Sequence, residues 1–302
     1  MLKNTLQHIR GLITPHRCLT AMMCVVVCML CACGSGNNKR VLAVSIPPQK
    51  WLLDSIVGDR YEVISMLSSD SNPETFEPSM RQLMELQSCQ AYFTIGDIPF
   101  EISSLPKMRE NFPSLSIINS TEGLDKITDS HASSAGESHD YSVDPHVWTS
   151  LVNARAIAAK MYDNVVALDP DGKDYYTARY KALDANLASL NDSVAKALRP
   201  IRGRAFVVWH PSLSYFARDY GLTQIGLETT GKETSVAQYK SRLENARQQN
   251  ALIFFTQAEF DTREADSMAK ELNLPTVKVS LMQPDIASQI RFLTHELTKA
   301  GN

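Results

Sequence analysis

Two series of short apolar segments alternate with helical segments along this chain, and one long uninterrupted segment separates the two series. The expected strands are Val41–Ile46, Tyr61–Leu67, Ala91–Gly96 and Leu115–Ile118 in the first series, and Arg204–Trp209, Leu222–Leu227, Ala251–Phe255 and Thr276–Val279 in the second. Short, nearly continuous apolar strands separated by helices are typical of parallel sheets that are covered on both faces. The sequence therefore predicts an α/β fold with two lobes, each containing a parallel sheet flanked by helices.

The separating segment, Lys173–Leu198, contains neither proline nor glycine. Its apolar residues recur at every third or fourth position, as on one stripe of an amphipathic helix. These residues are Tyr176, Tyr180, Leu183, Leu187 and Leu190. A helix of roughly 26 residues is about 39 Å long. We therefore expect one long rigid helix at 171–199 to join an N-terminal lobe at 41–168 to a C-terminal lobe at 204–302.

The N-terminus has the features of a signal for export. Three basic residues and no acidic residue precede position 33, and the apolar run Cys18–Ala32 is shorter than the roughly 20 residues that span a bilayer. Leu30-Cys31-Ala32-Cys33 resembles a bacterial lipobox, in which the signal is cleaved before a cysteine that becomes lipidated. Residues 1–32 are thus predicted to be a lipoprotein signal peptide, Cys33 the lipid anchor and residues 33–40 a flexible tether. The alternative is a plain signal peptide or an N-terminal membrane anchor.

Charge and cysteine content limit the partners of the exported part. The chain of 302 residues has a formal net charge of −3, and removal of 32 residues with three positive charges leaves 270 residues with a net charge of −6. An acidic body argues against nucleic acid or an anionic membrane surface as a partner. Cys89 is the one cysteine after Cys33, so the predicted domain cannot form an internal disulfide, and Cys89 is interpreted as a small buried residue.

Three residues that commonly bind metals lie where loops are expected to follow parallel strands. Glu74 follows the second strand, His146 lies where the polar loop 121–142 returns to the first lobe, and His210 follows the strand ending at Trp209. Such loops form the ligand sites of α/β folds, and two imidazoles with one carboxylate suit zinc and tolerate manganese or iron. However, 72 and 64 residues separate the three candidates, so each could instead be an ordinary turn residue or surface acid.

Several motifs stand out along the chain. They are Val44-Ser45-Ile46-Pro47, Asn72-Pro73-Glu74-Thr75-Phe76-Glu77-Pro78-Ser79, Ile95-Gly96 with Glu101, Asp144-Pro145-His146-Val147-Trp148, His210-Pro211-Ser212 with Tyr215-Phe216, Tyr220-Gly221-Leu222 and Glu233-Thr234-Ser235. Together they resemble the motifs of the metal-specific solute-binding proteins of ABC importers, the zinc-uptake and adhesin-lipoprotein group. The resemblance extends from about Val41 to the C-terminal helix. It implies the two-lobed fold and a metal site between the lobes.

The resemblance also assigns the ligands, with two departures. The second and third histidine ligands of the family fall on His146 and His210, whereas the first histidine falls on Glu74. An acidic fourth position, present in some members, falls on Ser280. A carboxylate has in effect moved from one lobe to the other, and one ligand is lost. Bidentate binding by Glu74 or a water molecule could fill the gap. Zn²⁺ is the expected ligand, with Mn²⁺ or Fe²⁺ possible.

The polar loop 121–142 contains His131 and the pair His139-Asp140, close to where zinc-type members of the group have a loop rich in histidine and acidic residues. The resemblance implies a weak auxiliary site that captures metal. The alternative is an ordinary surface loop.

The implied function is that of a reversible carrier without enzymatic activity. The resemblance implies a monomeric lipoprotein of the periplasm or cell envelope that captures Zn²⁺ and delivers it to an inner-membrane ABC permease with a cytoplasmic ATPase. Three alternatives stay open. One is a manganese or iron carrier, and another is a degenerate member with an adhesion or chelate-binding role. The third is a metallohydrolase, although the sequence contains no HExxH motif.

Overall fold

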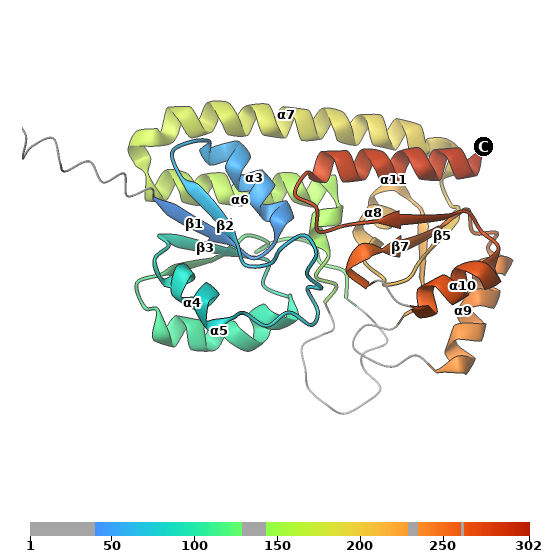
Figure 1. Ribbon diagram of the computed structural model, residues 1–302. Helices are drawn as coiled ribbons and strands as arrows, with labels where there is room; N and C mark the ends of the chain where they lie inside the picture. The colour runs from blue at the N-terminus through green and yellow to red at the C-terminus, as the bar shows by residue number, and fades with distance from the viewer. Residues whose placement is uncertain (1–39, 129–142, 229–234, 261–262) are drawn as a thin grey trace, which may run out of the picture. The chain divides into compact units, whose positions relative to one another are not determined.

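The computed structural model of the chain describes residues 40–128, 143–228, 235–260 and 263–302 (Figure 1). The predicted signal peptide, the lipid anchor Cys33 and most of the tether lie outside the described residues, as do His131, His139 and Asp140 of the polar loop. Within the described residues, every helix is too short or too polar to cross a membrane.

The first lobe contains a four-stranded parallel sheet. Its strands are β1 (Val41–Val44), β2 (Glu62–Ser65), β3 (Ala91–Thr94) and β4 (Ser116–Asn119), and its helices are α3 (Pro47–Val57), α4 (Met80–Gln87) and α5 (Pro99–Asn111). The strand order is β2-β1-β3-β4. All four residues of β3 are buried, as expected for a strand in the middle of a covered parallel sheet.

The second lobe repeats this topology. Its strands are β5 (Ala205–Val208), β6 (Thr223–Gly226), β7 (Phe254–Gln257) and β8 (Thr276–Val279), and its helices are α8 (Ser214–Tyr220), α9 (Val236–Gln248) and α10 (Arg263–Leu272). The order β6-β5-β7-β8 corresponds strand for strand to that of the first sheet. In each sheet the second strand of the lobe lies on one side of the first strand and the third strand lies on the other side. The loops at the carboxyl ends of β1 and β5 therefore border a crevice.

Helix α7 (Lys173–Leu198) joins the lobes, and α6 (Leu151–Leu168) and α11 (Ile286–Gly301) both pack against it. Figure 1 shows α7 passing over both sheets, with α11 beside it over the second lobe. The range of α7 agrees with the predicted helical stretch. Of the predicted apolar stripe, all members are buried except Tyr180, which is half-buried and stacks on Tyr162. The predicted α/β fold with two parallel sheets and one long joining helix is therefore confirmed.

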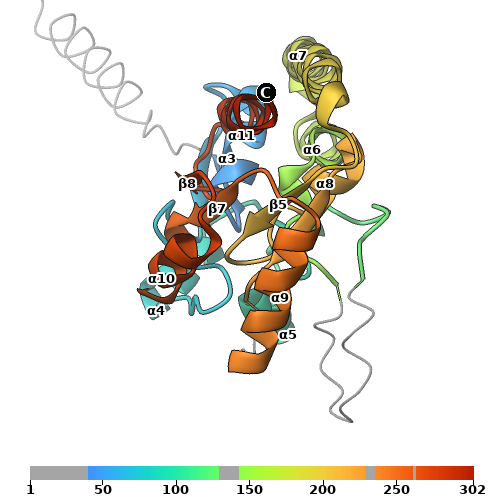
Figure 2. The same cartoon turned by 90° about the vertical axis from the view of Figure 1, so that its right-hand side faces the viewer.

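One apolar core continues from the first lobe into the second. It includes residues of β1 and β3, of helices α6, α7 and α11, and of one face of the second sheet. A smaller core lies on the other face of that sheet, under α9 and α10, away from α7 and α11 (Figure 2). A wide opening of the lobes would expose apolar surface of the shared core, at a free-energy cost of about 25 cal/mol per Å². The core therefore favours small relative movements of the lobes.

Several strand boundaries differ from the prediction by one or more residues. Helix α3 begins directly at Pro47, because proline fits the first turn of a helix, where its missing N–H is not needed. Strand β7 begins at Phe254, three residues after the predicted start, because its pairing with β8 starts there. The later strand carries Gln257 to the carboxyl edge of the sheet.

Glu101 fixes the carboxyl end of β3 from a fully buried position. Its carboxylate accepts hydrogen bonds from the hydroxyl of Ser45 and from the main-chain N–H groups of Ile95 and Gly96. Replacement by alanine would leave these buried donors without an acceptor, so Glu101→Ala should lower the free energy of unfolding by roughly 3 kcal/mol or more. Denaturant unfolding would measure this, with Glu110→Ala on the exposed side of α5 as control. Equal stability of the two variants would contradict the assigned role.

Candidate metal centre

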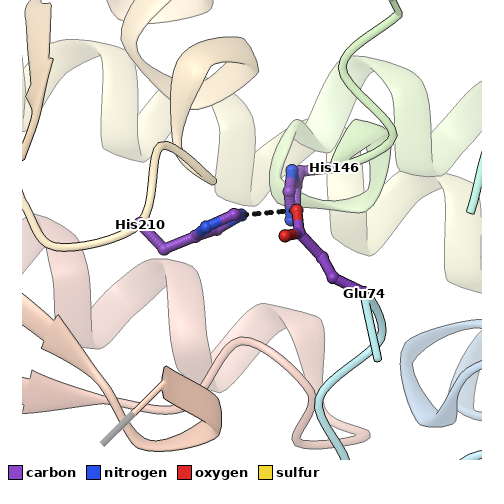
Figure 3. A group of neighbouring side chains, drawn as sticks. All are labelled: Glu74, His146 and His210. Carbon is purple, nitrogen blue, oxygen red and sulfur yellow. Dashed lines mark ion pairs between the residues drawn. The ribbon is translucent and has the colours of Figure 1, made fainter. Parts of the chain in front are cut away.

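Three loops bring Glu74, His146 and His210 together (Figure 3). Glu74 lies in the loop after β2, where the side chain of Asn72 accepts a hydrogen bond of 2.8 Å from the main-chain N–H of Glu74. His146 immediately precedes the short 3₁₀ helix Val147–Thr149 that leads into α6, and His210 follows β5. The first lobe thus supplies two of the side chains and the second lobe supplies one.

The three side chains are close enough to share one ion. One ligand atom of each lies within 4.8 Å of those of the others. Nε2 of His210 is 3.0 Å from Oε1 of Glu74, an ion pair marked in Figure 3. The two imidazole rings have centroids 5.2 Å apart and are inclined by 64°. His210 is fully buried, and the side chain of Glu74 is 14% exposed. The group is therefore compact and largely removed from solvent.

Asp144 orients His146. Its Oδ1 accepts hydrogen bonds of 2.9 Å from both the main-chain N–H and Nδ1 of His146. With the proton held on Nδ1, the lone pair of Nε2 is available to a metal. Burial raises the pKa of Asp144, but the interactions with His146 outweigh burial and place that pKa below its usual value. Asp144 is therefore an ionised partner that fixes the tautomer and the orientation of His146.

Glu228, Phe260 and Gln257 orient His210. Oε2 of Glu228 lies 3.3 Å from Nδ1, and the ring of Phe260 stacks on the imidazole with centroids 3.9 Å apart. The side chain of Gln257 accepts a hydrogen bond of 3.2 Å from the main-chain N–H of His210 and donates one of 2.5 Å to its carbonyl. Nε2, in contrast, is buried and faces Oε1 of Glu74 at 3.0 Å. This nitrogen points into the group, where a metal ion could take the place of its proton.

The electrostatics of the group favour binding of a cation. Burial lowers the pKa of His210, but the carboxylates of Glu228 and Glu74 outweigh burial and raise that pKa to about 9. Burial likewise raises the pKa of Glu74, whereas the neighbouring His210 lowers it more, so the net pKa is below normal. In this metal-free state a protonated imidazole neutralises the carboxylates. A divalent metal can replace that proton, and two imidazole nitrogens with a carboxylate oxygen are donors that zinc accepts.

Not all residues predicted for the site join this group. The hydroxyl of Ser280, the predicted fourth position, donates a hydrogen bond of 2.5 Å to Oε1 of Glu259. The sequence prediction assigned no role to Asp144 or Glu228, which support the two histidines. Glu228 follows β6 at the carboxyl edge of its sheet. Asp144 lies two positions before His146, which was a visible signal in the sequence.

Hydrogen bonds connect the His146 segment with the second lobe. Nε1 of Trp148 donates to the carbonyl of Leu281 at 3.0 Å. The hydroxyl of Tyr215 donates to the carbonyl of Asp144 at 2.7 Å and accepts from the main-chain N–H of Ile127 at 3.1 Å. The position of His146 is thus coupled directly to the second lobe.

The chain is similar to proteins of zinc uptake and zinc binding. A family model described as zinc-uptake complex component A, periplasmic, matches residues 42–297. The chain is 23% identical over 292 residues to the zinc-binding lipoprotein AdcA of Streptococcus pneumoniae, covering 94% of this chain but 56% of AdcA. It is 22% identical over 292 residues to the high-affinity zinc uptake system protein ZnuA of Bacillus subtilis, covering 87% of this chain and 88% of ZnuA. The chain thus spans little more than half the length of AdcA.

Solved structures agree with the family match. A crystal structure of ZnuA has a TM-score of 0.79 and 30% sequence identity, covering 88% of this chain and all of that chain. The cadmium-bound periplasmic metal binding protein of Candidatus Liberibacter asiaticus has a TM-score of 0.76 at 18% identity, covering 87% of this chain and all of that one, which shows a shared fold. Because the family model matches most of the sequence and the ZnuA fold covers most of the structure, the resemblance predicted from the sequence is confirmed, and the chain belongs to the periplasmic zinc-uptake component A family of solute-binding proteins.

Proposed function

We propose that this chain binds Zn²⁺ between its two lobes and delivers it to an ABC permease in the inner membrane, driven by a cytoplasmic ATPase. The observation that carries the proposal is the convergence of Glu74, His146 and His210, with Nε2 of His210 buried and directed at Oε1 of Glu74. Both imidazoles have an acidic partner at Nδ1, which leaves Nε2 for the metal. Membership of a solute-binding family favours reversible capture of an ion over catalysis at this group.

The donor set supports zinc over manganese or iron. Two imidazole nitrogens favour zinc on intrinsic affinity, whereas manganese prefers sites rich in oxygen. The relatives AdcA and ZnuA are named for zinc binding and zinc uptake. Two neutral histidines and one carboxylate leave a charge of about +1 around a divalent ion. A metal bound in this way is held firmly but remains exchangeable.

Release to the permease follows from the placement of the ligands. Because both lobes supply ligands, metal occupancy is coupled to their relative position, and the permease can distinguish the loaded from the empty surface. The continuous core under α6, α7 and α11 limits this change to a small tilt. We assign the N-terminal lobe to 41–168, the linking helix to 171–199 and the C-terminal lobe to 204–302.

We place the chain in the cell envelope as a monomeric lipoprotein. The signal 1–32 would be removed, and lipidated Cys33 with the tether 33–40 would hold the lobes near the membrane. His131, His139 and Asp140 of the polar loop would serve as an auxiliary site that captures metal.

Metal titration tests the proposal. The full-length chain, purified in detergent and stripped of metal, should bind zinc at a ratio of about one and more tightly than manganese in competition with a chelator. Tighter binding of manganese would instead identify a manganese carrier. Absence of binding at micromolar metal would refute the transport function and leave a family fold with an adhesion or chelate-binding role.

A further inference from the structure

Glu259 lies beside the metal centre with one carboxylate oxygen anchored and the other unpaired. It belongs to the short 3₁₀ helix Ala258–Phe260 that follows β7. Oε1 accepts hydrogen bonds from the hydroxyl of Ser280 at 2.5 Å and from the main-chain N–H of Met282 at 3.0 Å. Oε2 is buried and has no hydrogen-bond partner among the described residues. A buried carboxylate oxygen without a donor is costly, so a ligand is expected there.

The cavity that Glu259 lines also reaches the metal centre. Its walls include His146 and Pro73 from the first lobe and Ser212, Gln257, Glu259 and Phe260 from the second. Phe260, the next residue after Glu259, stacks on the ring of His210. The cavity has a volume of about 10 Å³, which is near the lower limit for one ordered water molecule.

Glu259 is not a member of the group itself. The described residues whose ligand atoms lie within 4.8 Å of one another are Glu74, His146 and His210. Zinc with three protein ligands keeps a fourth tetrahedral position, which a water molecule commonly takes. A carboxylate set back from the ligands is suited to accept a hydrogen bond from such a water.

We propose that Oε2 of Glu259 accepts a hydrogen bond from the water molecule at the fourth position of the metal held by Glu74, His146 and His210. This inference rests on the proposed metal-binding function and specifies how the site compensates for its missing ligand. Ser280, at the position where related chains have an acid, then acts indirectly, because its hydroxyl holds Glu259 in place. Two carboxylates, Glu74 and Glu259, would together balance the charge of the divalent ion.

The decisive variant is Glu259→Gln. The amide oxygen can still accept from Ser280 and Met282, but the amide nitrogen that replaces Oε2 donates hydrogen bonds and cannot accept one. We expect the zinc dissociation constant to rise by about 10- to 100-fold, the usual effect of removing a partner that supports a metal ligand. Glu264→Gln on the exposed face of α10 removes the same charge nearby and should bind zinc like the wild type.

A second readout follows coordination directly. With Co²⁺ in place of zinc, the full-length wild type and Glu264→Gln should show the intense visible absorption of a four-coordinate ion, and Glu259→Gln should change that spectrum. Ser280→Ala should shift affinity and spectrum in the same direction by a smaller amount, because Met282 still anchors Glu259. If denaturant unfolding shows that metal-free Glu259→Gln is misfolded, the zinc affinity and cobalt spectrum of Ser280→Ala test the role of Glu259 instead.

The outcomes separate the two proposals. Wild-type zinc affinity and an unchanged cobalt spectrum in Glu259→Gln would overturn the role of Glu259 while leaving the metal-binding function intact. Failure of the wild type itself to bind zinc would overturn the function and, with it, the water-mediated fourth position.

Discussion

Replacement of His210 by alanine is expected to weaken zinc binding by about a hundredfold to a thousandfold. Binding free energies of roughly 10–16 kcal/mol for zinc held by about four ligands correspond to some 2.5–4 kcal/mol for each ligand. His210 is the one histidine of the group that the second lobe supplies, and Phe260, Gln257 and Glu228 hold its ring in place. Its loss leaves Glu74 and His146, both from the first lobe, as the remaining members of the group.

Chelator competition with the full-length chain would measure the loss. Replacement of His295 by alanine is the matched control, because that side chain is 71% exposed on α11. It should bind zinc like the wild type. Retention of wild-type affinity by His210→Ala would show that zinc, if bound, uses a different site. Glu74→Ala is expected to lose affinity as well, since Glu74 is the sole carboxylate of the group.

Acidification is expected to release the metal over a wide range of pH. Glu228 and Glu74 outweigh burial and raise the pKa of metal-free His210 to about 9. Below that pH the metal must displace a proton, so the apparent affinity falls about tenfold for each unit of pH. Between pH 8 and pH 5 the loss from this group alone is about a thousandfold. Zinc binding near neutral pH should accordingly release about one proton from His210.

Titrations at several pH values, in buffers of different ionisation enthalpy, would measure both quantities. Glu228→Gln is the informative variant, because it removes one of the two carboxylates that raise the pKa of His210. Its zinc affinity should depend less steeply on pH between 7 and 9, whatever its absolute affinity. A wild-type affinity independent of pH in this range would contradict protonation of His210 in the metal-free chain.

The sequence alone determined the architecture of the chain. Apolar strands of four to seven residues, alternating with helical patterns, leave few folds other than parallel sheets covered on both faces. The stretch Lys173–Leu198 specified its own helix, because nothing in it interrupts the apolar periodicity. Boundaries were less certain: β7 starts later than its apolar residues suggest, because pairing with β8 rather than composition sets its start.

The candidate ligands were also visible in the sequence, although their meeting was not. Glu74, His146 and His210 occupy the carboxyl ends of strands or the segment leading into α6, where α/β folds bind ligands. The resemblance to a known family, rather than any spacing in the chain, predicted that the three belong together. The structure brings their ligand atoms close enough to share one metal ion, while the assignment of a metal to them stays a prediction.

Only the tertiary structure decided which groups support the ligands. Glu228 reaches His210 because β6 lies next to β5, and Glu259 reaches Ser280 because β7 lies next to β8. Strand order, which the sequence does not state, determines these neighbours. The shared core that restrains the lobes likewise depends on how α6, α7 and α11 pack. Patterns along the chain record burial and local conformation, whereas distances across a sheet arise only when the strands assemble.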